Sequence, residues 1–95
     1  MIRSTMQDYP LTIQAIMRHG AFVYGASECV TWTGARPRRS SYRQVAQDAA
    51  RLAGALARLG IGPGDPVATF GWNNTEHLEA YFGVPSMGAV LHTLN

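Results

Sequence analysis

Apolar positions recur with a helical period in the middle of the chain. Over residues 42–59 they form one stripe of a helix, and the opposite stripe is polar and charged. The apolar stripe consists of Val45, Ala49, Leu52, Ala53, Leu56 and Leu59. Ser41, with Gln44 three residues later, is a capping box that opens a helix, and Gly60 stands where a C-cap glycine belongs. The pattern predicts an amphipathic helix over residues 42–59.

Two short apolar runs follow this helix. Pro63-Gly64 makes a tight turn, residues 67–70 form the first run, and residues 89–91 form the second. Both runs have the length and composition of buried strands. We predict that they lie parallel, because the stretch between them is long enough for a crossover helix.

The connecting stretch, residues 73–87, is apolar on nearly every side, which indicates a buried helix. Asn73, with Glu76 three residues on, is the expected N-cap. Pro85 lacks an N–H group and is expected to kink or end the helix. Together with the two strands, this helix predicts a parallel strand–helix–strand unit.

The first forty residues predict an arm, a helix and a hairpin. Residues 1–11 are typical of an extended arm, and Thr12 is a fair N-cap for a helix over residues 13–24. Residues 29–32 are β-branched and aromatic, as in a strand, and residues 34–37 supply the turn of a small hairpin.

These elements predict an α/β fold that is incomplete on its own. We expect residues 1–95 to be the N-terminal fragment of one larger domain: an arm (1–11), a helix and hairpin (12–40), and a helix with the parallel unit (41–95). A parallel unit needs neighbours on both faces of its sheet. The composition, 46% hydrophobic and 15% charged, is apolar for so short a chain and indicates surface covered by further protein. We therefore expect the chemistry of the whole protein to lie beyond residue 95.

Composition excludes several kinds of chemistry. All eight basic residues are arginine, so this chain offers no Schiff-base lysine, phosphate-loop lysine or lysine base. A net charge of +2 does not favour a nucleic-acid partner, and no run of apolar residues is long enough to predict a transmembrane helix. Cys29 is the single cysteine, which leaves no internal disulfide and favours a reducing cytoplasm.

Two segments resemble phosphate-binding loops but lack the required context. Residues 60–64 (Gly-Ile-Gly-Pro-Gly) run from a helix to a strand, whereas such loops leave a strand and open a helix. Residues 31–34 (Thr-Trp-Thr-Gly) lack the later glycines and a lysine. We interpret both as structural turns, and a phosphate role is the less favoured alternative.

Three arginines cluster at the predicted hairpin tip: Arg36, Arg38 and Arg39. They could hold a phosphate or an acidic surface. The favoured interpretation is a solvated turn, or ion pairs with the remainder of the protein.

The other titratable side chains form no site by spacing. The histidines are His19, His77 and His92, and they lie on different predicted elements without the spacing of a metal site. Glu76 and Glu79 share one helix but lack a facing partner, and Asp65 fits its turn without a catalytic role. Residues 72–74 (Trp-Asn-Asn) are different, because they follow the carboxyl end of a parallel strand, where open α/β sheets bind ligands. For these residues helix capping is favoured over ligand contact.

The chain resembles the adenylate-forming enzymes. Residues 41–44 and 60–65 are similar to that superfamily's (S/T)Y-x-(E/Q) helix and its LG-(I/V)-x-PGD segment, and residues 79–90 are similar to its E-x-(Y/L)-(F/L)-(A/G)-x-P-x-x-GA-V segment. Residues 4–12 and 92–95 are similar to the fatty-acyl-CoA ligase branch in particular.

This resemblance implies a parent enzyme that converts a fatty acid and ATP to an acyl-adenylate and then to an acyl-CoA, with Mg²⁺ accompanying ATP. The implied partners are the remainder of the polypeptide and, as substrates, a fatty acid and coenzyme A. The implied location is cytoplasmic, with peripheral membrane association of the parent left open.

The superfamily's phosphate loop and its C-terminal lysine have no counterpart in this sequence. We therefore assign no catalytic, cofactor-binding or metal residue to the segment and expect it to be structural. Two alternatives remain: a stand-alone interaction module without catalysis, and a domain that covers its exposed sheet by self-association.

Overall fold

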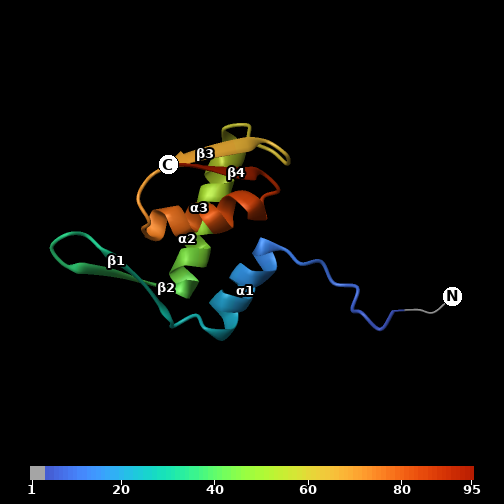
Figure 1. Cartoon of the computed structure of the whole chain (residues 1–95), viewed down its shortest axis with the longest axis horizontal. Coiled ribbons are helices and arrows are strands. Elements are labelled where there is room, and N and C mark those ends of the chain that lie inside the picture. The colour runs from blue at the N-terminus through green and yellow to red at the C-terminus, as the bar shows by residue number, and fades with distance from the viewer. Residues whose placement is uncertain (1–3) are drawn as a thin grey trace.

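The computed structural model describes residues 4–95, which form three helices and four strands. The elements are α1 (Ile13–Val23), β1 (Glu28–Trp32), β2 (Pro37–Ser41), α2 (Tyr42–Arg58), β3 (Pro66–Phe70), α3 (Thr75–Ser86) and β4 (Val90–Leu94). Of the arm predicted for residues 1–11, residues 1–3 lie outside the described part; the remainder extends away from the body beyond α1 (Figure 1). The predicted α/β class is confirmed.

The helix predicted over residues 42–59 is confirmed as α2, and both α1 and α3 pack against it (Figure 1). The Ser41 hydroxyl accepts a hydrogen bond from the Gln44 N–H at 3.1 Å, as an N-cap should. The Gln44 side-chain amide donates to Asp48 at 3.0 Å. Ser41 is also the last residue of β2, where it pairs with Glu28 of β1. The same residue therefore ends the hairpin and caps α2.

The C-terminus of α2 closes as the sequence predicts. Gly60 adopts a φ of 92°, a left-handed conformation that residues with a Cβ rarely adopt. The Ile61 N–H then reaches back to the Leu56 carbonyl at 3.1 Å, which completes a Schellman turn.

The parallel strand–helix–strand unit is confirmed. β3 and β4 pair in parallel from Pro66 opposite Val90 to Phe70 opposite Leu94, and α3 packs against both strands. The strand predicted over residues 89–91 is misplaced, because β4 starts one residue later and runs three residues further. Its length is set by one-to-one pairing with β3, which carries the strand through polar positions that local pattern does not favour.

α3 begins one residue later than predicted. Asn74, not Asn73, is the N-cap: its backbone is extended and its side-chain oxygen accepts the His77 N–H at 2.9 Å. The predicted effect of Pro85 is confirmed, because the helix ends at the next residue, Ser86. Gly88 follows with a φ of 84° and turns the chain into β4.

The N-terminal half also follows the prediction in outline. The Thr12 hydroxyl caps α1 by accepting the Ala15 N–H at 3.1 Å. β1 and β2 pair antiparallel as the expected hairpin, and Gly34 in its loop has a φ of 92°. This two-stranded sheet is separate from the β3–β4 sheet.

The buried core is small and lies mainly where α2 crosses α3, with Ala89 before β4 added to it. Its hydrophobic members are Val45, Ala49, Ala80, Val84 and Ala89, of which Val84 is the largest side chain that is fully buried. Gly83 of α3 approaches the backbone of Ala49 so closely that a Cβ on it would lie 2.7 Å from the Ala49 carbonyl oxygen. In contrast, Leu11, Phe22, Phe70 and Trp72 each expose more than four-fifths of their surface. The described residues therefore bury few of their own large apolar side chains.

Candidate functional site

The carboxyl ends of β3 and β4 lie at one edge of the parallel sheet, where topology favours a site. Here residues 71–74 connect β3 to α3. Trp72 is 88% exposed, and Asn73 is exposed as well. Asn74 is occupied as the N-cap of α3. The favoured interpretation of this segment, helix capping, is therefore confirmed for Asn74.

The hairpin packs against the same end of α3. Thr31 of β1 and Thr75 of α3 place their hydroxyl oxygens 2.8 Å apart, and the Thr75 N–H donates to the Thr31 hydroxyl at 3.0 Å. The Cys29 sulfur lies 3.7 Å from the Thr75 hydroxyl. Thr75 is buried, with 6% of its surface exposed. The Thr31 hydroxyl is thus engaged within the chain, as the structural interpretation of residues 31–34 expects.

Two of the three clustered arginines are ion-paired within this chain. Arg38 contacts Glu76 of α3 at 2.7 Å, and Arg39 contacts Glu28 of β1 at 2.7 Å. Arg38 and Arg39 lie within β2 and not at the hairpin tip as predicted, and the two alternatives given for the cluster, a solvated turn or ion pairs with the remainder of the protein, did not include these partners within the chain. The hydrogen bond with Arg38 lowers the pKa of Glu76, and the same bond raises the pKa of Arg38. Both side chains are half-exposed, so the pair adds little to stability.

Thr69 and His77 join β3 to α3. The Thr69 hydroxyl lies 3.0 Å from His77 Nε2, and the Tyr81 ring lies 4.9 Å from the imidazole, centroid to centroid. A hydroxyl beside an imidazole is the start of a nucleophile–base pair, but that chemistry needs a third group to orient the base. His77 Nδ1 is buried and has no hydrogen-bond partner among the described residues. We interpret the pair as a tie between strand and helix.

The three histidines lie on three different elements, α1, α3 and β4. His19 lies on α1 beside Tyr24, and His92 is exposed on β4. Over residues 4–95, no group of three or more His, Cys, Asp or Glu side chains is placed to hold a metal ion.

The glycine loop of residues 60–64 is a structural turn. The Gly62 N–H donates to the Asp65 carboxylate at 2.8 Å, which gives Asp65 the turn role that the sequence predicts. The Gly64 N–H donates to the Gly88 carbonyl at 2.8 Å and so links this loop to the turn before β4. These two donors are engaged within the chain rather than directed at a phosphate.

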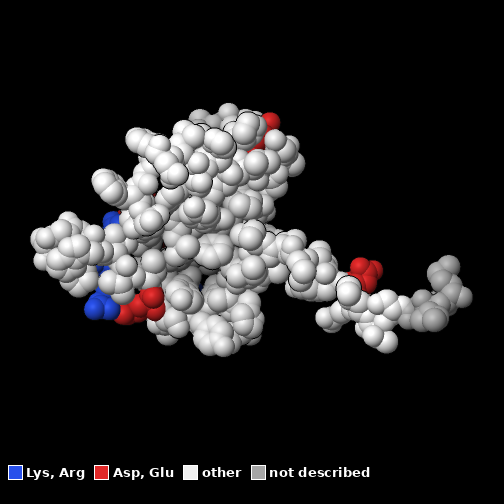
Figure 2. Space-filling view, in the orientation of Figure 1, with Lys and Arg blue, Asp and Glu red and all other residues white. Residues whose placement is uncertain are grey.

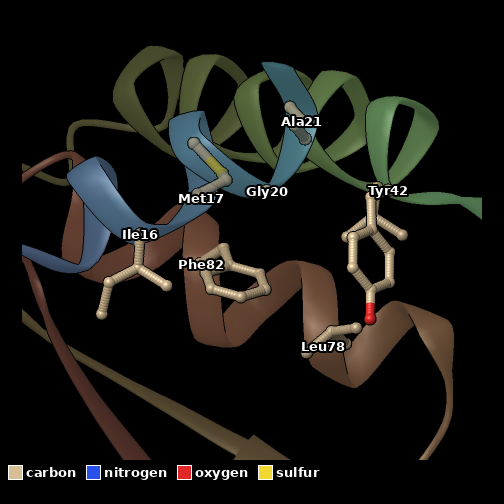
Figure 3. Close-up of a pocket in the computed structure, with 9 residues that line it drawn as sticks. Ile16, Met17, Gly20, Ala21, Tyr42, Leu78 and Phe82 are labelled. Atoms are coloured by element: carbon tan, nitrogen blue, oxygen red, sulfur yellow. The ribbon is translucent and has the colours of Figure 1, made fainter. Parts of the chain in front are cut away.

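A half-open cavity of about 220 Å³ lies between the three helices (Figure 3). Figure 3 shows Ile16 and Met17 from α1, Tyr42 from α2, and Leu78 and Phe82 from α3 around it. The lining is apolar apart from the Tyr42 hydroxyl. Such a cavity can accommodate hydrocarbon but offers little polar chemistry to orient a reacting group.

Charge is sparse on the face shown in Figure 2, where charged side chains gather mainly near the hairpin. Glu79 of α3 is half-buried, and burial together with the nearby Asp48 and Glu76 carboxylates raises its pKa. Opposing pKa shifts of this kind in Glu76 and Glu79 follow from one ion pair and one partly desolvated carboxylate. They do not require a catalytic pair.

Sequence reasoning missed the contacts between the hairpin and α3. Thr31 and Thr75 are 44 residues apart, and nothing local to either indicates the other. A weak signal existed in β1, where Cys29 and Thr31 alternate with exposed residues and so face the same side.

The architecture is similar to that of domains in known enzymes. It superposes on the N-terminal domain of FACL13 from Mycobacterium tuberculosis with a TM-score of 0.82 and 29% identity, over 90% of this chain and 22% of that one. The fold is that of the N-terminal domains of adenylate-forming enzymes. Residues 9–95 match the family model described as AMP-binding enzyme, and the chain belongs to this family.

Two relatives that are similar in sequence are fatty-acid–CoA ligases. A long-chain-fatty-acid–CoA ligase of Thermus thermophilus is 49% identical over 94 residues, covering 97% of this chain and 17% of the relative. A medium-chain-fatty-acid–CoA ligase of Ectopseudomonas oleovorans is 41% identical over 86 residues, covering 90% of this chain and 16% of the relative. The chain matches the N-terminal part of such ligases and spans about one-sixth of their length.

No helix within residues 4–95 is both long and apolar enough to cross a membrane.

Proposed function

We propose that this chain is the N-terminal segment of an ATP-dependent fatty-acid–CoA ligase and that the segment itself is scaffold. The 49% identity to the Thermus thermophilus ligase across 97% of this chain is the observation that supports this most directly. The small core and the exposed large apolar side chains agree with it, because further protein would cover them.

The parent would join a fatty acid to ATP as an acyl-adenylate, release pyrophosphate, and pass the acyl group to the thiol of coenzyme A, with Mg²⁺ bound to ATP. The described residues do not fit a nucleotide site: the Gly62 and Gly64 N–H groups are engaged within the chain, and no lysine is present. The proposal therefore assigns ATP, Mg²⁺ and coenzyme A to the remainder of the polypeptide. The parent is proposed to act in the cytoplasm.

Within the parent, residues 1–95 would form one part of the large domain, without catalytic, cofactor-binding or metal residues. β3 and β4 would be sheet strands and α2 a covering helix. Each strand has a neighbour on one side only within the described residues, which leaves room for the sheet to grow.

Fatty-acid-dependent exchange of labelled pyrophosphate into ATP tests the proposal. The complete protein that carries this segment should catalyse exchange with medium- or long-chain fatty acids, and the 95-residue chain should show none. Exchange by the 95-residue chain would overturn the scaffold assignment. Absence of exchange by the complete protein, with acids of every chain length from acetate upward, would overturn the ligase assignment.

The mass of the native protein in cell extract separates the remaining alternatives. A species several-fold heavier than 10.3 kDa that retains its mass in denaturant supports a longer polypeptide. A heavy species that dissociates to 10.3 kDa chains would instead support self-association, and a 10.3 kDa monomer would support a stand-alone interaction module.

A further inference from the structure

Side chains of the hairpin, including Cys29 at 3.7 Å from the Thr75 hydroxyl, converge on two successive residues at the start of α3. The Thr31 hydroxyl accepts the Thr75 N–H at 3.0 Å and lies 2.8 Å from the Thr75 hydroxyl, and Arg38 contacts Glu76 at 2.7 Å. Asn74, the residue just before them, caps the helix and ends the connection from β3. The hairpin thus contacts the point where the carboxyl-edge loop, residues 71–74, enters the helix.

The hairpin depends on these contacts. A two-stranded hairpin is at best marginally stable by itself, and β1 and β2 pair with no other strand among the described residues. Its base is fixed to the start of α2, because the Tyr42 N–H donates to the Ser27 carbonyl at 2.9 Å and the Arg43 N–H to the Gly25 carbonyl at 3.2 Å. Further from the base, the hydrogen bonds between the hairpin and the body are those to Thr75 and Glu76.

The two contacts differ in strength. Arg38 and Glu76 are half-exposed, and solvent screens an ion pair of that kind. Thr75 is buried, so loss of Thr31 would leave its N–H without this hydrogen bond, and would leave its hydroxyl only the weak contact with the Cys29 sulfur, in a site that water reaches poorly. The Thr31–Thr75 pair is therefore the decisive contact.

We propose that the hairpin is a strap that the Thr31–Thr75 pair latches onto the N-terminus of α3, and that the latch holds residues 71–74 in place at the carboxyl edge of the sheet. Release of the pair frees the strap and loosens the first turn of α3 together, because Thr75 directly follows the N-cap. The strap opens without unfolding α2, since its base remains fixed by the backbone bonds at Tyr42 and Arg43.

Hydrogen exchange followed by mass spectrometry, on the complete protein that carries this segment, tests the strap. In the unchanged protein, peptides covering residues 28–41 and 71–78 should open together. The open state of these peptides should be more populated than the open state of α2. Thr31→Val should accelerate exchange in both peptides by about tenfold and leave α2 unchanged. Thr31→Ser keeps the hydroxyl and should restore protection. Thr33→Val removes a hydroxyl that bonds within the hairpin loop, to the Arg36 carbonyl, and should leave residues 71–78 unaffected.

Three results would overturn the proposal. If Thr31→Val accelerates exchange only in residues 71–78, the hairpin does not depend on the pair. If every peptide accelerates equally, the pair supports global stability and is no latch. Exchange in the unchanged protein tests the proposal even if a variant fails to fold. If residues 28–41 and residues 71–78 open with different free energies, they are not held by one shared latch.

Discussion

Gly83 lies where α3 crosses α2, and its replacement by alanine tests how tightly that crossing is packed. A Cβ at this position would lie 2.7 Å from the Ala49 carbonyl oxygen and 3.4 Å from its carbonyl carbon. Both are backbone atoms inside α2, so no flexible side chain can move aside. The helices would have to part by roughly 0.7 Å to restore ordinary contact with the oxygen.

The energetic result is a difference between two opposed effects. Alanine is favoured over glycine inside a helix by about 1 kcal/mol. Overpacking of a close contact costs about 1–3 kcal/mol, and a gap of this size also forfeits a quarter or more of the neighbouring dispersion energy. We therefore expect Gly83→Ala to destabilise the crossing by about 1–2 kcal/mol.

A matched control lies on the facing helix. A Cβ on Gly54 of α2 would meet only the end of the Arg58 side chain, at 3.7 Å. Gly54→Ala should therefore stabilise α2 by about 0.5–1 kcal/mol, through helix propensity without overpacking. The same substitution is thus predicted to have opposite signs at two glycines on two helices that pack together.

Thermal unfolding and amide exchange of α2 and α3, in the complete protein that carries the segment, would measure both variants. Gly83→Ala should lower the midpoint and speed exchange in both helices, and Gly54→Ala should slow exchange in α2. The packing argument fails if Gly83→Ala is as stable as the unchanged protein. It fails equally if Gly83→Ala and Gly54→Ala change the stability in the same direction.

Three further predictions concern polar side chains. Ser41→Ala should destabilise α2 by about 1 kcal/mol, measured by urea unfolding, because it removes the N-cap acceptor; Ser41→Thr should not. Glu79→Gln should raise the melting temperature at pH 7, because the pKa of Glu79 is raised and its ionised form therefore costs stability at that pH. Below about pH 4.5 the carboxyl is protonated in both the folded and the unfolded protein, so the gain should vanish. A gain in melting temperature that persists in acid would contradict this. Arg38→Gln should change stability by no more than about 1 kcal/mol and raise the pKa of Glu76 toward its ordinary value, seen by NMR titration; an unmoved pKa would refute the assigned cause.

Local pattern predicts α2 well because every local preference agrees. The apolar stripe, the Ser41 cap and Gly60 all mark the same helix, and tertiary packing needs no departure from them. The start of α3 shows the limit. Asn73 and Asn74 have the same capping chemistry, and the choice between them depends on where the chain leaves β3 and where Thr75 meets Thr31.

The features that the local sequence pattern does not predict depend on contacts between residues distant in sequence. β4 extends to Leu94 because β3 supplies a partner for each residue, and this pairing cannot be read from the residues of β4. The sequence shows the arginine cluster, but the acidic partners Glu76 and Glu28 lie on other elements. Topology favours a site at residues 72–74, and the sequence predicts helix capping there, but the contact of the Thr31 hydroxyl with Thr75 depends on how the hairpin folds against α3.

The sheet of β3 and β4 has a consequence for anyone who wishes to express this segment apart from its neighbours. Among the described residues each strand leaves one edge unpaired, and neither strand contains a charged Arg, Lys, Asp or Glu residue of the kind that commonly protects natural edges. A free edge of this composition invites strand addition by another molecule. The 95-residue chain expressed by itself should therefore aggregate through intermolecular β-pairing, and a soluble version would need these edges covered, as further protein of the proposed parent would cover them.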